Sequence, residues 1–316
     1  MALGLAALAF VLIWLGSAPL VYLVTIIMIW AIATTGLDLV FSVTGILVLG
    51  HGALLAAGAY AFAILTMDFG MAGLPALLLA CVAGALLGAL MGAPSLRLSG
   101  LHMALATLAV SQIFFVLITV KLRGITGGTD GLPGVPRPEL PLVDIYDDRI
   151  FGVFVVLMFL LALVVYARLR ESPFGQILKG IRQNEMRVRQ LGADVRLYKL
   201  ASFAVSGAFA GLAGALLSGQ SYIVGPEIAT WMVSGELVIM IVLGGRGVFI
   251  GPVVGVAIFM LLKEVVSHHT PYWGGILGIV FILITLFMPG GLTGLFGGLF
   301  RRPTKARPAG EGRAAS

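Results

Sequence analysis

The chain has 316 residues, of which 59% are hydrophobic and only 11% are charged, with a formal net charge of +6. A soluble domain carries roughly 25% charged residues, so this composition, with a mean hydropathy of +1.08, excludes an ordinary soluble fold. The single cysteine, Cys81, excludes a disulfide within the chain and a cysteine-based metal site.

Apolar runs long enough to cross a bilayer recur along almost the whole chain. They lack the alternation of a barrel strand and therefore predict an all-α fold, a polytopic transmembrane helical bundle. We expect about ten spans, within a range of 8–11, in one domain over residues 1–300. Residues 1–13 have no basic n-region, so the first run is expected to be a retained span and not a cleaved signal peptide. The predicted spans are 3–17, 20–36, 44–66, 73–96, 101–121, 150–168, 199–220, 229–244, 248–266 and 274–294.

Basic residues are concentrated in two segments, 168–199 and the tail 301–316, whereas acidic residues dominate the loop 122–149. Cytoplasmic loops of membrane proteins carry an excess of Lys and Arg. We therefore expect an inner loop over 169–198, an outer loop over 122–149, cytoplasmic N- and C-termini, and a disordered cytoplasmic tail over 301–316. The positive charge is thus a topology signal, and no nucleic-acid partner is expected.

Few polar residues lie within the predicted spans, and polar groups at membrane depth mark pathways by default. Thr107 and Ser111 share one helix face, and the segment 50–52 is a glycine-flanked break where the backbone is expected to unwind. Glu236 is interpreted as the one deep acid; it either lines the pathway or accepts hydrogen bonds from neighbouring helices. His51 has the alternative role of a structural hydrogen-bond donor. The candidate pathway residues are Gly50, His51, Thr107, Ser111 and Glu236.

Small residues recur at intervals of four and predict grooves for close helix packing. The alternative is that such glycines form hinges or thin pore walls. The series are Gly84, Gly88 and Gly92, then Ala210, Gly214 and Ser218, then Gly251 and Gly255.

The outer segment 126–136 is rich in Gly and Pro and predicts turns. Two aromatic residues, Tyr166 and Tyr198, flank the inner loop, as interfacial aromatics do. The histidines lack carboxylate or cysteine companions at ligand spacing, so we expect no metal site and no cofactor.

The inner loop contains two predicted helices. Ser172 and Pro173 are an N-cap and first-turn pair, and an apolar face follows. Asn184 is expected to cap a second helix, 185–191, with Val188 and Leu191 on one side, and Gly192 to end it. This short amphipathic helix is either a docking element for another protein or an interfacial helix resting on anionic lipid. The apolar face of the first helix is Phe174, Ile177, Leu178 and Ile181.

The chain contains no G-x-x-x-x-G-K-[ST] phosphate-binding loop. Any ATP that drives its function must therefore be hydrolysed by a different subunit. Paired carboxylates, a nucleophile–base set and a metal cluster are also missing from the sequence, which argues against an enzyme.

Four sequence blocks, in this order, resemble the LivM-type permeases of branched-chain amino-acid ABC importers over nearly the full length of the chain. Two departures from the family pattern are Gly52, where alanine is more frequent, and the pair Arg187 and Val188, where small residues are usual. The blocks are 44–53 with 58–60, 126–136, 172–192 with 198–199, and 234–252.

The resemblance implies an ABC importer permease in the cell inner membrane, with no covalent chemistry of its own. It implies a second homologous permease, two ABC ATPases and a secreted solute-binding protein as partners. It also implies that the inner loop is a coupling loop seated on the ATPase. The residues assigned to coupling are Ser172, Gly175, Arg182, Asn184, Glu185, Val188 and Gly192.

Two other functions stay open at this stage. The cargo of the same importer class is either a branched-chain amino acid or urea, a short amide or an aromatic acid. A self-contained secondary transporter or channel is the alternative from another class, although ion coupling usually needs several intramembrane acids.

Overall fold

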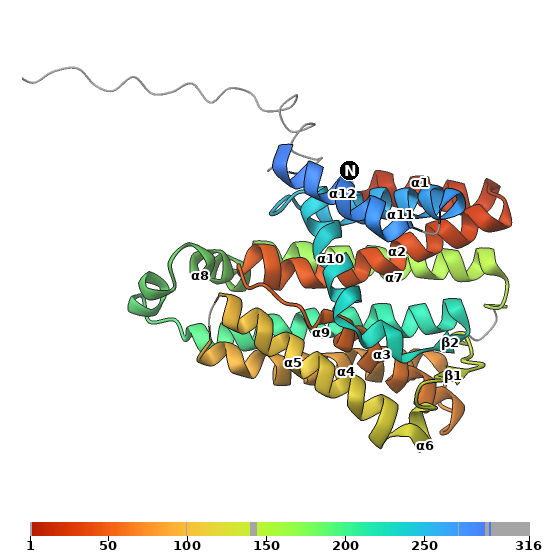
Figure 1. The fold of residues 1–316 in the computed structure, drawn as a ribbon, viewed down its shortest axis with the longest axis horizontal. Helices are drawn as coiled ribbons and strands as arrows, with labels where there is room; N and C mark the ends of the chain where they lie inside the picture. Colours follow the sequence, from red (N-terminus) through yellow and green to blue (C-terminus); the bar gives the residue numbers. More distant parts are fainter. Residues whose placement is uncertain (1, 99, 140–143, 271, 288–290, 292–316) are drawn as a thin grey trace, which may run out of the picture.

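The computed structural model describes residues 2–98, 100–139, 144–270, 272–287 and 291. Figure 1 shows an elongated bundle in which most long helices run roughly along its length. The predicted tail 301–316 lies outside the described residues.

Each predicted apolar segment contains one helix in the structure. Five of these helices are long and apolar enough to cross a membrane: those over 18–43, 73–92, 101–121, 148–171 and 195–221. The number of about ten spans therefore stays a prediction. The helices that match the predicted segments are α1 (Ala2–Leu15), α2 (Ala18–Asp38), α3 (His51–Met67), α4 (Gly73–Gly92), α5 (Leu101–Val116), α7 (Asp148–Glu171), α9 (Val195–Ser221), α10 (Trp231–Gly244), α11 (Gly251–His269) and α12 (Trp273–Phe287).

Short elements extend or connect the long helices. α2 and α5 continue as π-helical turns, and one further helix, α8 (Pro173–Gln190), forms most of the inner loop. Strands β1 (Leu132–Pro133) and β2 (Ile223–Val224) pair antiparallel, so the all-α expectation misses one two-residue ladder. The remaining elements are η1 (Leu39–Val43), η2 (Ala93–Leu96), η3 (Leu117–Lys121), α6 (Arg123–Thr126) and η4 (Pro226–Ala229).

The non-helical backbone before α3 covers residues 44–50 and so begins earlier in the chain than the predicted break at 50–52. Residues 44–50 are not helical, and α3 begins at His51. The predicted break is therefore present at Gly50 but does not include His51 and Gly52, and the predicted span start at 44 is wrong. Gly45 has a φ of +83°, a left-handed conformation that interrupts a helix. The amide of Leu49 donates to Thr107 Oγ1 (3.1 Å), which satisfies a backbone group that the missing helix leaves unpaired.

Close packing around α9 confirms the predicted small-residue grooves. A Cβ added at Gly84 of α4 would collide with the carbonyl oxygen of Gly207, and one at Gly207 with the carbonyl oxygen of Gly84. On another face of α9, a Cβ at Gly214 would collide with the carbonyl of Leu55 in α3. Helices in lipid associate through such van der Waals contact, because burial of apolar surface gives little driving force there.

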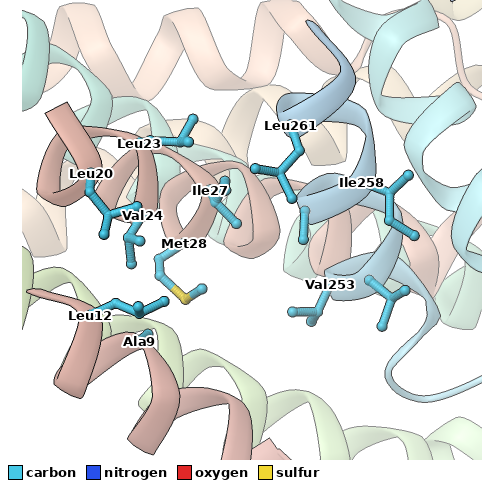
Figure 2. Close-up of a pocket in the computed structure, with 12 residues that line it drawn as sticks. Ala9, Leu12, Leu20, Leu23, Val24, Ile27, Met28, Val253, Ile258 and Leu261 are labelled. Atoms are coloured by element: carbon cyan, nitrogen blue, oxygen red, sulfur yellow. The ribbon is translucent and has the colours of Figure 1, made fainter. Parts of the chain in front are cut away.

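An open groove lies between α1, α2 and α11 (Figure 2). Its volume is about 370 Å³, and its lining consists of Ala, Leu, Val, Ile and Met side chains. Such a surface suits lipid chains and offers no polar side chain to a charged solute.

The inner and outer loops lie at opposite ends of the bundle. In Figure 1, α8 projects from one end, whereas α6, β1 and β2 lie at the other. This separation agrees with the predicted placement of segments 169–198 and 122–149 on opposite sides of a membrane.

Candidate functional site

The inner loop folds as two helices that meet at Asn184, as predicted. The side chain of Ser172 accepts from the amide of Gly175 at 3.4 Å, and Pro173 occupies the first turn. Asn184 has extended dihedral angles (φ −162°, ψ 101°), and its Oδ1 accepts from the amide of Arg187 at 3.1 Å. Gly192 has a φ of +88° and ends the second helix.

The second helix presents an apolar patch to solvent. Val188 is buried, and its side chain lies close to Gly180. Leu191 is 86% exposed, so the prediction that it shares one side with Val188 is wrong. The reason is that α8 ends at Gln190 and Leu191 lies at its C-cap. Met186, which is 62% exposed, and Leu191 are the exposed large apolar side chains of this helix and its C-cap, and the two together are called the apolar patch.

Glu185 is turned toward the bundle. Its carboxylate lies 2.7 Å from the ammonium of Lys199, at the base of α9, and 2.9 Å from the guanidinium of Arg189. The Lys199 side chain is only 9% exposed. The ion pair therefore fixes the start of the second helix against the membrane domain.

The turn from α7 into α8 is tight at Gly175. A Cβ there would collide with the carbonyl oxygens of Leu169 and Arg170. Glycine at this position allows the inner loop to fold back against the end of α7.

A buried acid that the sequence interpretation missed lies close to this loop. Asp38, at the end of α2, is fully buried, and the hydroxyl of Tyr166 donates to its carboxylate. Arg170 donates to Tyr166 Oη at 3.4 Å and also to the carbonyl of Gly247. Asp38 is thus a buried acid in addition to Glu236, and the Tyr166 side chain faces the inside of the bundle. Asp38 falls two residues beyond the predicted span 20–36, which is why it was overlooked.

Two further arginines contact η1, the π-helical continuation of α2. Arg182 of α8 donates to the carbonyl of Ser42, and the guanidinium of Arg246 lies 4.0 Å from the ring centroid of Phe41. Partial burial, with a smaller contribution from Arg182, lowers the pKa of Arg246. The inner end of the bundle is therefore a dense network of cations bound to backbone carbonyls and aromatic rings.

The candidate pathway residues separate into two groups. Thr107 and Ser111 are fully buried; Ser111 Oγ donates to the carbonyl of Ala229 in η4 at 2.8 Å. Gly50 packs against the backbone of Thr107, so the structure brings these three residues together. His51, at the start of α3, is also fully buried.

Glu236 belongs to the second group and is 25% exposed on its side chain. Its carboxylate lies 3.5 Å from the ammonium of Lys263 on α11. Lys263 was not considered in the sequence interpretation, although a deep acid calls for a cationic partner.

Gly52, one of the two departures from the family pattern, has no room for alanine in this structure. A Cβ there would lie 2.7 Å from the carbonyl oxygen of Ile228 and 2.8 Å from that of Thr230. The amide of Gly52 donates to Ser234 Oγ at 2.9 Å. The start of α3 is thus fixed closely against η4 and α10.

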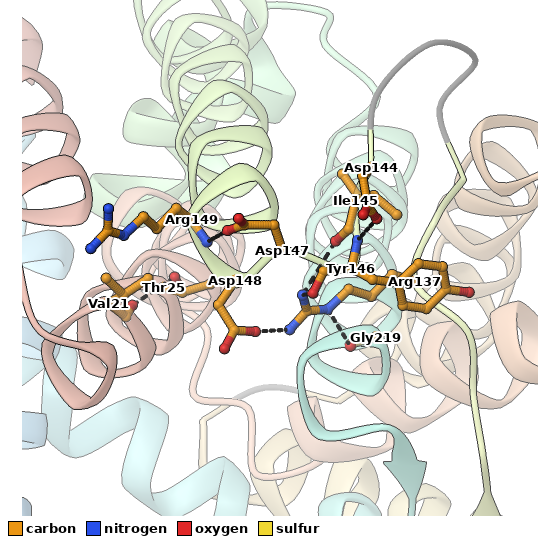
Figure 3. A network of polar contacts seen from close by, with 10 residues as sticks. All are labelled: Val21, Thr25, Arg137, Asp144, Ile145, Tyr146, Asp147, Asp148, Arg149 and Gly219. Atoms are coloured by element: carbon orange, nitrogen blue, oxygen red, sulfur yellow. Dashed lines mark hydrogen bonds and ion pairs between the residues drawn. The ribbon is translucent and has the colours of Figure 1, made fainter.

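The outer end is organised around Arg137, which is 1% exposed (Figure 3). Its guanidinium lies 2.5 Å from Asp148 Oδ1 and donates to the carbonyls of Ile145 (3.2 Å), Tyr146 (2.9 Å) and Gly219 (3.4 Å). These bonds join the outer loop to the start of α7 and the end of α9. Sequence reasoning missed Arg137, because nothing in a loop sequence shows that one arginine is buried.

An aromatic side chain adds to the outer network. The Arg137 guanidinium lies 5.0 Å from the ring centroid of Tyr222, which follows α9. Partial burial raises the pKa of Tyr222. Within the described ranges, no group of three His, Cys, Asp or Glu side chains is placed to hold a metal ion.

Long apolar helices joined by a structured polar loop indicate a multi-pass membrane protein. A family profile described as "Branched-chain amino acid transport system / permease component" matches residues 20–285. The chain is 32% identical over 299 residues to the high-affinity branched-chain amino acid transport system permease protein LivM of Escherichia coli strain K12, covering 87% of this chain and 70% of that protein. The chain therefore belongs to the branched-chain amino acid transport permease family, which confirms the resemblance.

More distant relatives include two proteins of Methanocaldococcus jannaschii. The probable branched-chain amino acid transport permease protein LivM is 26% identical over 69% of this chain and 67% of its own length. The probable permease protein LivH is 25% identical over 82% of this chain and 87% of its own length. No solved structure matches the chain significantly.

Proposed function

We propose that this chain is a permease subunit of an ABC importer that moves branched-chain amino acids across the cell inner membrane. The single observation that carries the proposal is the family membership over residues 20–285. LivM and LivH both match the chain, which supports pairing with a second homologous permease. Two ABC ATPases and a secreted binding protein complete the proposed importer, and the chain performs no covalent chemistry.

The coupling loop 169–198 docks on the ATPase in this proposal. The exposed patch of Met186 and Leu191 is the contact surface, because apolar groups outside lipid favour a protein partner. The coupling residues hold this patch in place. Ser172, Asn184 and Gly192 set the helix ends and Gly175 the turn. Arg182 and Glu185 bind the rest of the bundle, and Val188 packs against Gly180 of the first loop helix.

The proposed orientation places the coupling loop and both termini in the cytoplasm, with loop 122–149 outside. The distribution of Lys and Arg supports it. Residues 1–300 form the permease domain, and 301–316 form a cytoplasmic tail.

The proposed translocation route passes along the interface with the second permease. The buried residues Gly50, His51, Thr107 and Ser111 support its wall, and Glu236 with Lys263 supplies a charged pair. The apolar groove of Figure 2 is a poor route, because a zwitterion needs polar partners.

The presence of two acids within the helices supports a second candidate function, a self-contained secondary transporter. Asp38 is fully buried and Glu236 largely so, and an ion-coupled carrier requires several acids within its helices. Both are already bound, however, to Tyr166 and Lys263 respectively. Uptake by the chain alone, driven by an ion gradient, would support that candidate and contradict the importer. Within the importer class, urea, short amides and aromatic acids are the competing cargoes, which a panel of radiolabelled solutes would separate.

Co-expression with the partner ATPases tests the proposal directly. The chain should co-purify with them, and proteoliposomes with the binding protein should show ATP-dependent leucine uptake. Replacing the exposed Met186 by Glu should uncouple ATP hydrolysis from uptake while membrane insertion is retained; Arg196→Gln, at an exposed site, is the control. Normal coupled uptake in the Met186→Glu variant would refute the docking role.

A further inference from the structure

The inner end of α2 has an irregular backbone where the coupling loop contacts it. α2 continues as the π-helical turn η1, and such single π-turns are frequent at functional sites. The guanidinium of Arg182, in the coupling loop, donates to the carbonyl of Ser42 within η1. One side chain of the loop therefore holds the last helical turn before the non-helical segment 44–50.

The Arg182 side chain also covers the first part of the non-helical segment 44–50. Gly45 has a φ of +83°, and a Cβ added there would lie 2.8 Å from Arg182 Cγ. The aliphatic part of Arg182 thus lies on the Gly45 backbone while its guanidinium binds Ser42. Two adjacent contacts from one side chain restrict how segment 42–45 can move relative to α8.

A cavity beside these contacts leaves room for movement. It has a volume of about 130 Å³, and Thr44, Gly45 and Ile46 form part of its lining. The coupling loop contributes Ile181, Arg182 and Glu185, and α9 contributes Lys199. A shift of segment 44–46 into this space would not displace a packed core.

The far end of the segment reaches the candidate pathway residues. The amide of Leu49 binds Thr107 Oγ1, Gly50 packs on the Thr107 backbone, and α3 starts at His51. Segment 44–50 is therefore a short non-helical connection between a coupling-loop contact and the buried polar cluster. The segment is only seven residues long and is held at both ends, by Arg182 at Gly45 and by Thr107 at Leu49, so a displacement at the first contact pulls on the second.

We propose that Arg182 is a positioning residue that transmits movement of the coupling loop to segment 44–50 and so to the start of α3. The inference rests on the proposed function, because the movement originates in the partner ATPases. Arg182 was assigned to the ATPase contact from the family resemblance. In the structure its guanidinium faces the membrane domain, and its role is internal.

The test measures ATP hydrolysis and leucine uptake separately in the reconstituted importer. Arg182→Gln should leave assembly with the ATPases and ATP hydrolysis in place, and should lower uptake per ATP hydrolysed by about tenfold. Arg182→Lys should restore part of the loss, since an ammonium can still donate to the Ser42 carbonyl. The matched control is Arg196→Gln, which removes the same charge at an exposed position on the same side.

A second variant protects the test against misfolding of the first. Gly45→Ala places a methyl group against Arg182 and strains a left-handed residue, so it should produce the same split between hydrolysis and uptake. Combining Gly45→Ala with Arg182→Gln should lower uptake per ATP no further than either single change. Wild-type coupling in Arg182→Gln, or additive losses in the double variant, would overturn the inference. Absence of ATP-dependent leucine uptake in the importer reconstituted with the wild-type chain would instead contradict the proposed function.

Discussion

The ammonium of Lys199 lies 2.7 Å from the carboxylate of Glu185, and this pair joins the second helix of the coupling loop to the base of α9. Lys199 is largely removed from water, whereas Glu185 is partly exposed. A pair of this kind is costly to break from one side, because the remaining charge loses its partner. The helix that carries the exposed patch is thereby held in one orientation.

Reversing the charge of Lys199 should therefore be more damaging than removing it. Lys199→Glu places two carboxylates together and should destabilise the protein by about 3 kcal/mol, whereas Lys199→Met should cost about 1 kcal/mol. The double change Glu185→Lys with Lys199→Glu should recover part of the stability. Thermal unfolding in detergent measures all three, and equal losses in the two single variants would show that the pair has no role.

The contact between α4 and α9 gives a second prediction. Gly207→Ala should destabilise the protein by about 1–3 kcal/mol, because the new methyl group meets the backbone of Gly84. Gly235→Ala in α10 is the matched control, since an added Cβ there meets nothing within 4 Å. In the control, alanine should match or slightly raise the melting temperature. A tolerated Gly207→Ala would mean that the two helices are farther apart than the structure shows.

Local rules predicted much of this molecule from its sequence. Apolar run length located the helices, and the Ser172, Asn184 and Gly192 signals located the ends of the coupling-loop helices. Apolar run length and helix-end signals both depend on interactions between residues near one another in the chain. The four-residue glycine intervals predicted close packing for the same reason, although they did not identify the partner helices.

The polar contacts between distant segments were not predictable in this way. Asp38 and Tyr166 are 128 residues apart, and Arg137 and Gly219 are 82 apart. Whether such a group is buried depends on which helices meet, and periodicity carries no information on that. The start of α3 was misplaced for a similar reason: Leu49 finds its acceptor on Thr107, a side chain 58 residues away.

Arg137 gives a prediction for the outer end. Arg137→Gln leaves several buried carbonyls without donors and should cost about 2–4 kcal/mol, and Arg137→Lys should rescue little because one ammonium cannot replace a planar fork of donors. Hydrogen exchange of amides 144–152 should rise in both variants. Arg149→Gln, at an exposed neighbouring position, should leave exchange unchanged. Unchanged exchange in Arg137→Gln would contradict the assigned role.

Thr107 tests whether the unwound segment matters for transport. Thr107→Val keeps the shape of the side chain but removes the acceptor of the Leu49 amide, which should cost about 1–3 kcal/mol and lower the maximal rate of leucine uptake. Thr107→Ser keeps the oxygen and should retain most of the rate. Thr119→Val is the matched control, because the Thr119 hydroxyl donates to the carbonyl oxygen of Phe115, four residues earlier, and does not bind segment 44–50. If Thr107→Val and Thr119→Val transport leucine equally well, the bond that fixes segment 44–50 to α5 is not needed for transport.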